Sequence, residues 1–397
     1  MNYFEKKEKN IMTKIEKSVI DFIERNIKYI CFIVVFIIGV LIRYLMRDGM
    51  SGDMNVCLLP WFEEMERGGV DSLGKTIGNY NVPYVIIMTL LTYLPFNPMY
   101  MIKMVSIVFD LLLAGACAYL VKDKIKDNLL VFTGVFLSPV VMLNSAWWGQ
   151  CDSVYVAFLL FTLVFVKQEK WIPAFIMYGI AFAFKLQAIF LMPFLVVLYF
   201  RKKSFSLFHF LIVPVVNFTL CLPAAIMGRP IKDIVMIYIS QTFAYQQMTM
   251  NYPNMYAILP FPYEGFHTIA LLIALTVLGI GAYLVIKEKC DFNIENSISS
   301  VIWSVWSCVL FMPAMHERYG YLMEILFIVY AIVWKKKVVM CCMVNFITLC
   351  TYCNYLFGNS VFNMNMLAII NIIMYILYTI DIVKQLGVTQ DNESIKL

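Results

Sequence analysis

Long apolar runs dominate this chain and limit the folds that it can adopt. Residues 29–46, for example, contain a single charged residue, Arg43, and similar runs recur almost to the end of the chain. Hydrophobic residues make up 61% of the 397 residues and charged residues only 14%, which is far outside the range of soluble proteins. The runs lack the alternation of membrane β-strands, so we predict an all-α, polytopic transmembrane helical bundle.

Clusters of lysine and arginine predict the topology. They recur after every second apolar run, which by the positive-inside rule places their loops in the cytoplasm. The clusters are Lys122, Lys124 and Lys126; Lys167 and Lys170; Arg201, Lys202 and Lys203; Lys287 and Lys289; and Lys335, Lys336 and Lys337. About twelve spanning helices are then expected, at 29–46, 101–121, 128–146, 152–166, 171–184, 187–200, 207–226, 267–286, 298–314, 319–334, 338–356 and 364–383. Because these loops carry the basic residues, nucleic acid is not an expected partner.

This topology divides the chain into a cytoplasmic segment at 1–28, a bundle at 29–384 and a cytoplasmic tail at 385–397. Two long loops fall outside the cytoplasm. The first, at 47–100, is expected to hold juxtamembrane helices, because its apolar segment 83–96 is too short to span. The second, at 227–266, contains several prolines, which favour extended structure.

The short outer segments carry ionisable residues beside aromatic ones, which predicts one site at the outer ends of the helices. Asp53 follows Gly52, which permits a turn that presents the carboxylate to the bundle. A carboxylate near apolar surface can act as a general base. The alternative is an ordinary loop aspartate in solvent.

A run of ionisable residues, His316, Glu317 and Arg318, precedes Tyr319 at another predicted outer boundary. The planar guanidinium of an arginine fits phosphate oxygens, and the neighbouring histidine can add a donor or a proton. The alternative is an arginine that extends to the interface beside an anchoring tyrosine. Three ionisable residues in a row at this depth favour the functional interpretation.

Two further outer segments fit a lipid-linked sugar. Lys185 interrupts an apolar stretch beside Gln187, where it can hold a lipid phosphate or form a simple polar hairpin tip. A second group, Trp147, Trp148 and Gln150, can stack on a sugar ring and bond to it, or anchor the chain at the interface. Asp152 can orient a partner or join a metal site.

Charged residues within the runs are expected to be structural. Asp110 lies about two helical turns from Lys103, which predicts a charge pair inside the bundle, with Arg43 in another run. Cys350 and Cys353 form a CxxC pair without a second pair or a histidine nearby, so packing is favoured over metal binding.

On these residues, the chain resembles the GT-C superfamily of polyprenol-phosphate-sugar-dependent glycosyltransferases, in particular bacterial members similar to GPI-anchor mannosyltransferases. The resemblance covers roughly residues 29–335. It is carried by Ser51-Gly52-Asp53 with Pro60-Trp61, Asn79-Tyr80-Asn81-Val82-Pro83-Tyr84, Trp148-Gly149-Gln150-Cys151-Asp152-Ser153, Lys185-Leu186-Gln187 and Met315-His316-Glu317-Arg318-Tyr319.

The resemblance implies roles for these residues. Asp53 is the expected catalytic residue, and the donor phosphate is expected at Lys185, His316 and Arg318. The expected substrate-binding residues are Trp147, Trp148, Gln150, Asp152, Gln187, Glu317, Tyr319, Tyr84 and Asn254. Many members have a second acid after the catalytic aspartate, whereas this chain has Met54, so the need for a divalent metal stays open and no other cofactor is expected.

The expected function is an inverting hexosyl transfer, mannosyltransferase-like, on the outer face of the bacterial plasma membrane, in cell-envelope glycan or glycolipid assembly. Nucleotide sugars are made inside the cell, so an outward site must use a polyprenyl-phosphate sugar already moved across the bilayer. The acceptor is a glycan, a glycolipid or a protein. The alternatives are a flippase or transporter of a polyprenyl-linked glycan and a polysaccharide polymerase. A secondary transporter is disfavoured, because no inverted repeat and few midplane charges are visible.

Overall fold

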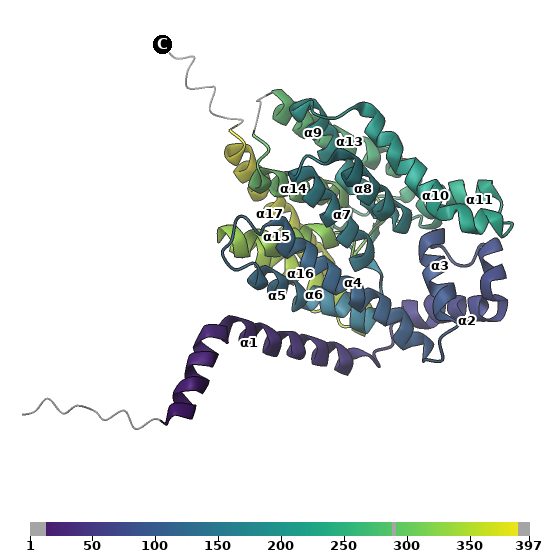
Figure 1. Ribbon diagram of the computed structural model, residues 1–397. Coiled ribbons are helices and arrows are strands. Elements are labelled where there is room, and N and C mark those ends of the chain that lie inside the picture. Colours follow the sequence, from purple (N-terminus) through teal and green to yellow (C-terminus); the bar gives the residue numbers. More distant parts are fainter. Residues whose placement is uncertain (1–12, 288–290, 388–397) are drawn as a thin grey trace, which may run out of the picture.

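The computed structural model describes residues 13–287 and 291–387, and the described chain is almost entirely helical (Figure 1). Parts of the predicted features lie outside these residues: 1–12 of the segment 1–28, 388–397 of the tail at 385–397, and Lys289. The first half contains α1 (Lys14–Met46), η1 (Met54–Leu58), α2 (Leu59–Gly68), η2 (Gly69–Gly74), α3 (Val82–Leu91), α4 (Pro98–Leu120), α5 (Leu129–Phe136), α6 (Pro139–Met142), η3 (Leu143–Trp148), α7 (Asp152–Lys167), α8 (Trp171–Phe184), η4 (Leu186–Leu191) and α9 (Met192–Lys202). The second half contains η5 (Leu207–Leu211), α10 (Ile212–Ile226), α11 (Ile231–Ala244), β1 (Thr249–Met250), α12 (Met255–Ile258), α13 (Tyr263–Lys287), α14 (Ile294–Phe311), β2 (Met315–His316), α15 (Tyr321–Trp334), α16 (Val338–Phe357) and α17 (Met364–Gln385).

The helices make this an all-α, multi-pass membrane protein. Within the described ranges, 7 helices are long and apolar enough to cross a bilayer, and an eighth span results if the bent pair Leu129–Phe136 and Pro139–Trp148 counts as one. The helices α8 and α15, with 14 residues each, reach only about 21 Å, which is short of the hydrocarbon thickness. The number of twelve spans is therefore not confirmed.

The bundle has a buried centre and a lipid-like periphery. In the 18-residue apolar stretch of α14 that could span the membrane, 72% of the residues are buried, whereas in those of α1 and α13 only 11% and 17% are buried. The exposed side chains of α1 and α13 are mostly large and apolar, as expected for helices that face lipid. Figure 1 shows α1 extending along one edge of the bundle, with its first turns projecting away from it.

The first loop contains short helices, as the sequence predicts. The apolar segment expected at 83–96 is helical as α3, which ends at Leu91, and the segment after Pro60 forms α2. Both α2 and α3 are 10 residues long, too short to span. They lie together beside the ends of α10 and α11 (Figure 1).

The second loop differs from the prediction of extended structure. Its first half is the helix α11, because Pro230 occupies the N-cap position, where a proline does not interrupt the helix. Extended structure lies between Ala244 and α12, where β1 pairs in parallel with β2. This pairing holds the second loop against His316.

An ion pair between Arg43 and Asp110 ties α1 to α4 inside the bundle. Arg43 Nη2 lies 2.9 Å from Asp110 Oδ2 and donates to the carbonyl of Phe136, while Ser145 Oγ donates to the same carboxylate. The predicted partner, Lys103, instead donates to backbone carbonyls at the end of α1. The prediction was wrong because residues seven apart on a helix are separated by about 10 Å along its axis.

Candidate active site

The turn before η1 positions Asp53. Ser51 Oγ donates to the carbonyl of Trp148 at 3.0 Å and accepts the backbone N–H of Met54 at 3.1 Å. One hydroxyl thus fastens the end of α1 to the end of η3 and caps the turn that carries Asp53. Gly52 and Asp53 are already helical and Gly52 has no positive φ, so Asp53 lies in the first turn of a helix and not in the glycine turn that the sequence predicts.

The carboxylate of Asp53 accepts hydrogen bonds from distant segments of the chain. Its Oδ2 accepts from Trp148 Nε1 at 2.9 Å and from Gln150 Nε2 at 2.7 Å, and its Oδ1 accepts from the Tyr355 hydroxyl at 2.6 Å. These donors fix the plane of the carboxylate. The side chain is nevertheless 23% exposed, so it is not an ordinary loop aspartate and a substrate can still approach it.

Arg318 lies at the centre of a group of carboxylates. Its Nη1 is 3.1 Å from Glu317 Oε1 and 3.9 Å from Asp53 Oδ2, and its Nε is 3.6 Å from Asp152 Oδ2. The guanidinium also lies over the Trp148 ring, 5.0 Å from its centroid. Burial disfavours the charge, but the three acids outweigh it and raise the pKa of Arg318. Arg318 therefore stays a cation, and its buried Nε makes no hydrogen bond.

A second cation, Lys185, shares one of these acids. Lys185 Nζ is 2.5 Å from Asp152 Oδ1, and Asn144 Nδ2 donates to Asp152 Oδ2 at 2.9 Å. Lys185 occupies an extended break between α8 and η4, and Asp152 begins α7. Asp152 thus joins the two basic side chains and orients both of them.

The pKa values of His316 and Glu317 are shifted in opposite directions. Burial, with Arg318 and Lys185 nearby, lowers the pKa of His316 to about 2, so at neutral pH its ring is uncharged. Burial raises the pKa of Glu317, although Arg318 acts against the shift, and Glu317 Oε2 has no hydrogen-bond partner. His316 can therefore contribute a hydrogen bond to a ligand, but not a positive charge.

The two cations line a cavity of about 470 Å³ between η4, α11, α13 and the loop before α15. The lining includes Lys185, His316 and Arg318, together with Gln187 and Tyr319. Gln187 Oε1 is buried and has no partner. The lining also includes many apolar side chains, among them Ile189, Phe190, Phe243, Leu271 and Met312. We call this the cationic cavity; a ligand with an anionic head and an apolar tail matches its lining.

Some predicted residues stand apart from these contacts. Trp147 packs edge-on against Phe357, and Tyr84 lies behind Tyr80, with ring centroids 4.6 Å apart. Asn254 caps α12 and donates to a backbone carbonyl of the second loop. These three positions shape the surroundings of the site.

Two residues were not predicted. Tyr355, on α16, bonds to Asp53, and Asn144 orients Asp152. Tyr355 lies beyond the part of the chain that the resemblance covers and has no charged neighbour, so no local pattern in the sequence marks it. Asn144 interrupts an apolar run shortly before Trp147, which could have marked it.

The residues that the structure describes contain no group of three or more histidine, cysteine, aspartate or glutamate side chains arranged to hold a metal ion. In the site, the acids Asp53, Asp152 and Glu317 are gathered around Arg318.

Comparisons with known proteins find no match: no family model matches the chain, and no curated protein sequence matches it. A function must therefore be inferred from the arrangement of Asp53, Arg318, Lys185 and the cationic cavity.

Proposed function

We propose that this protein is a membrane-embedded, inverting glycosyltransferase of the GT-C type. It moves a sugar from a polyprenyl-phosphate carrier to an acceptor hydroxyl on the outer face of the bacterial plasma membrane, in cell-envelope glycan or glycolipid assembly. One observation carries the proposal. Asp53 lies 3.9 Å from Arg318, and Arg318 lines a cavity whose lining combines two cations with many apolar side chains.

The cationic cavity suits the donor. A polyprenyl-phosphate sugar has an anionic phosphate between a sugar and a hydrocarbon tail, and the lining offers two cations next to apolar walls. Arg318 Nε makes no hydrogen bond, so it can donate to a phosphate oxygen while Glu317 pairs with Nη1. His316 adds an uncharged donor.

The position of Asp53 suits a general base. The acceptor O–H loses its proton to Asp53 as its oxygen bonds to the anomeric carbon. The bond from that carbon to the phosphate oxygen breaks on the opposite side, and both of its electrons leave with the polyprenyl phosphate. Arg318 and Lys185 stabilise the charge that grows on the leaving phosphate. A single displacement of this kind inverts the anomeric centre.

The residues around Asp53 suit a sugar. Trp148 and Gln150 already orient the carboxylate, and Gln187 offers an amide oxygen without a partner inside the cationic cavity. Glu317 and Tyr319 flank the arginine. We propose these side chains as the polar contacts that select the sugar and the acceptor.

The proposal requires the site to face outward, with about twelve crossings and both termini in the cytoplasm. The new thiol of Asp71→Cys, in the first loop, should react with an impermeant thiol reagent on intact cells. The new thiol of Lys336→Cys should react only after permeabilisation. The signal is read above that of the parent, which already has 11 cysteines. Reversed labelling would invert the topology and remove the argument for a lipid-linked donor.

Sugar transfer can be tested with purified protein in nanodiscs. The donors are radiolabelled polyprenyl-phosphate hexoses, and a cell-envelope lipid and glycan extract supplies acceptors, with water as a slow substitute. We expect release of polyprenyl phosphate and a product with the opposite anomeric configuration, identified by mass spectrometry and NMR. Asp53→Asn is the matched negative control.

The same protein in liposomes separates the alternatives. Movement of an intact donor between leaflets, without cleavage of the sugar–phosphate bond, would replace the transferase by a flippase. Retention of configuration would exclude the single displacement. Extension of a glycan by repeated addition of preassembled units would favour a polymerase.

A further inference from the structure

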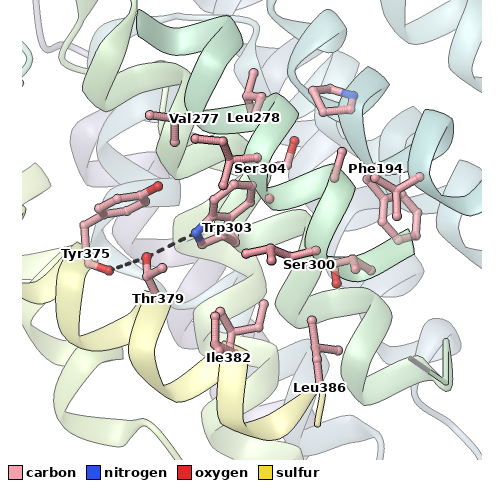
Figure 2. Close-up of a pocket in the computed structure, with 18 of the residues that line it drawn as sticks. Phe194, Val277, Leu278, Ser300, Trp303, Ser304, Tyr375, Thr379, Ile382 and Leu386 are labelled. Carbon is pink, nitrogen blue, oxygen red and sulfur yellow. Dashed lines mark hydrogen bonds between the residues drawn. The ribbon is translucent and has the colours of Figure 1, made fainter. Parts of the chain in front are cut away.

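A second cavity, of about 310 Å³, lies deeper in the bundle between α9, α13, α14 and α17. Figure 2 shows Trp303 of α14 in its centre, between Phe194 of α9 and Tyr375 of α17. Val277 and Leu278 close it on the side of α13 (Figure 2). We call this the inner cavity.

The inner cavity offers an occupant almost no polar contact. Trp303 Nε1 donates to Thr379 Oγ1 at 3.1 Å, and that hydroxyl donates to the carbonyl of Tyr375 (Figure 2). Ser304 Oγ donates to the carbonyl of Phe190. Ser300 Oγ is the exception, being buried without a partner. A lining of this kind suits hydrocarbon rather than a head group, because the polar atoms of the wall are already satisfied.

The inner cavity continues the walls of the cationic cavity. Along α13, the cationic cavity is lined by residues up to Leu271 and the inner cavity begins at Val277. Phe311 lines the inner cavity, and the next residue, Met312, lines the cationic one. The third shared wall passes from η4 into α9. The same three walls therefore lead from the cations into the bundle.

The helix α13 is exposed on the outside of the bundle along most of its length. Only 17% of its 18-residue apolar stretch is buried. The start of α13 is kinked, with non-helical backbone angles at Glu264 and Gly265. A chain in the lipid can therefore pass beside α13 without displacing packed side chains. At Gly281, by contrast, the helix is in close contact with Trp303, because a Cβ there would lie 2.2 Å from the indole ring.

We propose that the inner cavity binds the distal part of the polyprenyl tail of the donor, so that the enzyme recognises the length of the carrier as well as its phosphate. This inference rests on the proposed function for the identity of the head group. From His267 to Leu284 the walls extend roughly 26 Å along α13. A tail whose phosphate is held by Lys185 and Arg318 must cover that length to reach the inner cavity.

The position can be tested with polyprenyl phosphate that carries a diazirine at the far end of its tail. After illumination in nanodiscs, we expect labelled peptides from 277–285 or 375–386. Ala282→Phe, which fills the inner cavity, should reduce this labelling by about tenfold. The matched control, Gly279→Phe, lies on the same helix with nothing within 4 Å, and it should label like the parent.

Several outcomes would overturn the assignment of the inner cavity to the polyprenyl tail, which we call the tail site. Labelling elsewhere, or undiminished labelling in Ala282→Phe, would leave the inner cavity without this occupant. Competition by ordinary phospholipid as effective as that by unlabelled polyprenyl phosphate would assign it to an acyl chain.

Kinetics provide an independent measurement. With Ala282→Phe, the kcat/KM for a full-length donor should fall about tenfold, to the value for a donor too short to reach the inner cavity, and the value for the short donor should not change. Equal losses for both donors would indicate a general packing defect and contradict the tail site.

The two proposals fail separately. If the parent protein is labelled in the inner cavity as expected but transfers no sugar from any donor, the proposed function fails and the tail site stands. If the parent transfers sugar but the label falls elsewhere, only the tail site fails.

Discussion

Both ends of the helical bundle contain ion pairs between basic side chains and carboxylates, but the carboxylates differ in how far they are exposed. At the site end, Arg318 and Lys185 meet Asp152, whose side chain is 0% exposed. At the other end, which we call the lysine-rich end, the basic loops pair with acids whose side chains are between 22% and 61% exposed. These pairs are Lys28–Asp127, Lys167–Asp123, Lys202–Glu169, Lys336–Glu295 and Lys337–Asp381.

We interpret this difference as separating charges that set orientation from the charges of the proposed chemistry. Exposed pairs cost little to form and contribute little, about 0–1 kcal/mol each. Buried ions carry a desolvation cost that stability alone does not justify. At the site end that cost is borne beside a cavity, where buried charges can act on a ligand. The lysines of the other end fit the positive-inside rule and need no further role.

The largest effect on stability is expected at the buried pair between Arg43 and Asp110. Arg43→Met leaves Asp110 buried without its cation and should lower the free energy of unfolding by about 3–5 kcal/mol. Removing both charges, with Arg43→Met and Asp110→Leu, should recover much of the loss. Equilibrium unfolding in a denaturing detergent measures each variant. A double variant no more stable than the single one would show that the pair does more than neutralise a buried charge.

The next largest effect concerns activity and separates two acids of the first loop. Asp53→Asn keeps the shape and removes the base, so turnover should fall by roughly 10²-fold or more, with normal protein level. Asp48→Asn alters a 58% exposed carboxylate that pairs with Arg47, and its turnover should match that of the parent. Initial rates at saturating donor compare the two. Normal turnover in Asp53→Asn would remove Asp53 from the mechanism.

The general class and the segments of the site could be predicted from the sequence, because both depend on local composition. Apolar runs determine that the chain is helical in a membrane, and a polar residue at the end of such a run is conspicuous. Asp53, the break at Lys185 and the clustering around Arg318 all have such local signals.

The pairing of side chains could not be predicted, because it depends on which helices become neighbours. Asp110 bonds to Arg43 of a distant helix and not to Lys103 of its own. Tyr355 reaches Asp53 across 302 positions, from a helix with no charged residue near it. The prolines of the second loop predicted extended structure, but the loop begins with α11, whose N-cap is Pro230.

A smaller effect tests whether Arg318 acts by its geometry or by its charge. Lysine keeps the charge but loses the planar fork, in which Nη1 pairs with Glu317 while Nε makes no hydrogen bond. Arg318→Lys should therefore lower kcat/KM about tenfold, and Arg318→Ala should lower it further.

Rates against donor concentration, in matched nanodiscs, distinguish the two roles of Arg318. An arginine that only reaches the interface would tolerate lysine, since either side chain can place a charge there. Parent-like rates in both variants would transfer phosphate binding to Lys185.

The smallest effect is expected at the lysine-rich end, where the comparison can be broken most directly. Lys202 and Glu169 lie 2.9 Å apart, but their side chains are 37% and 55% exposed. Lys202→Gln should lower the free energy of unfolding by no more than about 1 kcal/mol, and by less at high salt, because solvent screens the pair. Sugar transfer should be unchanged, since the pair lies at the opposite ends of the helices from Asp53. A loss of several kcal/mol, or of activity, in Lys202→Gln would mean that burial does not separate the two ends. The argument that buried charge marks the site would then fail for Lys185 as well.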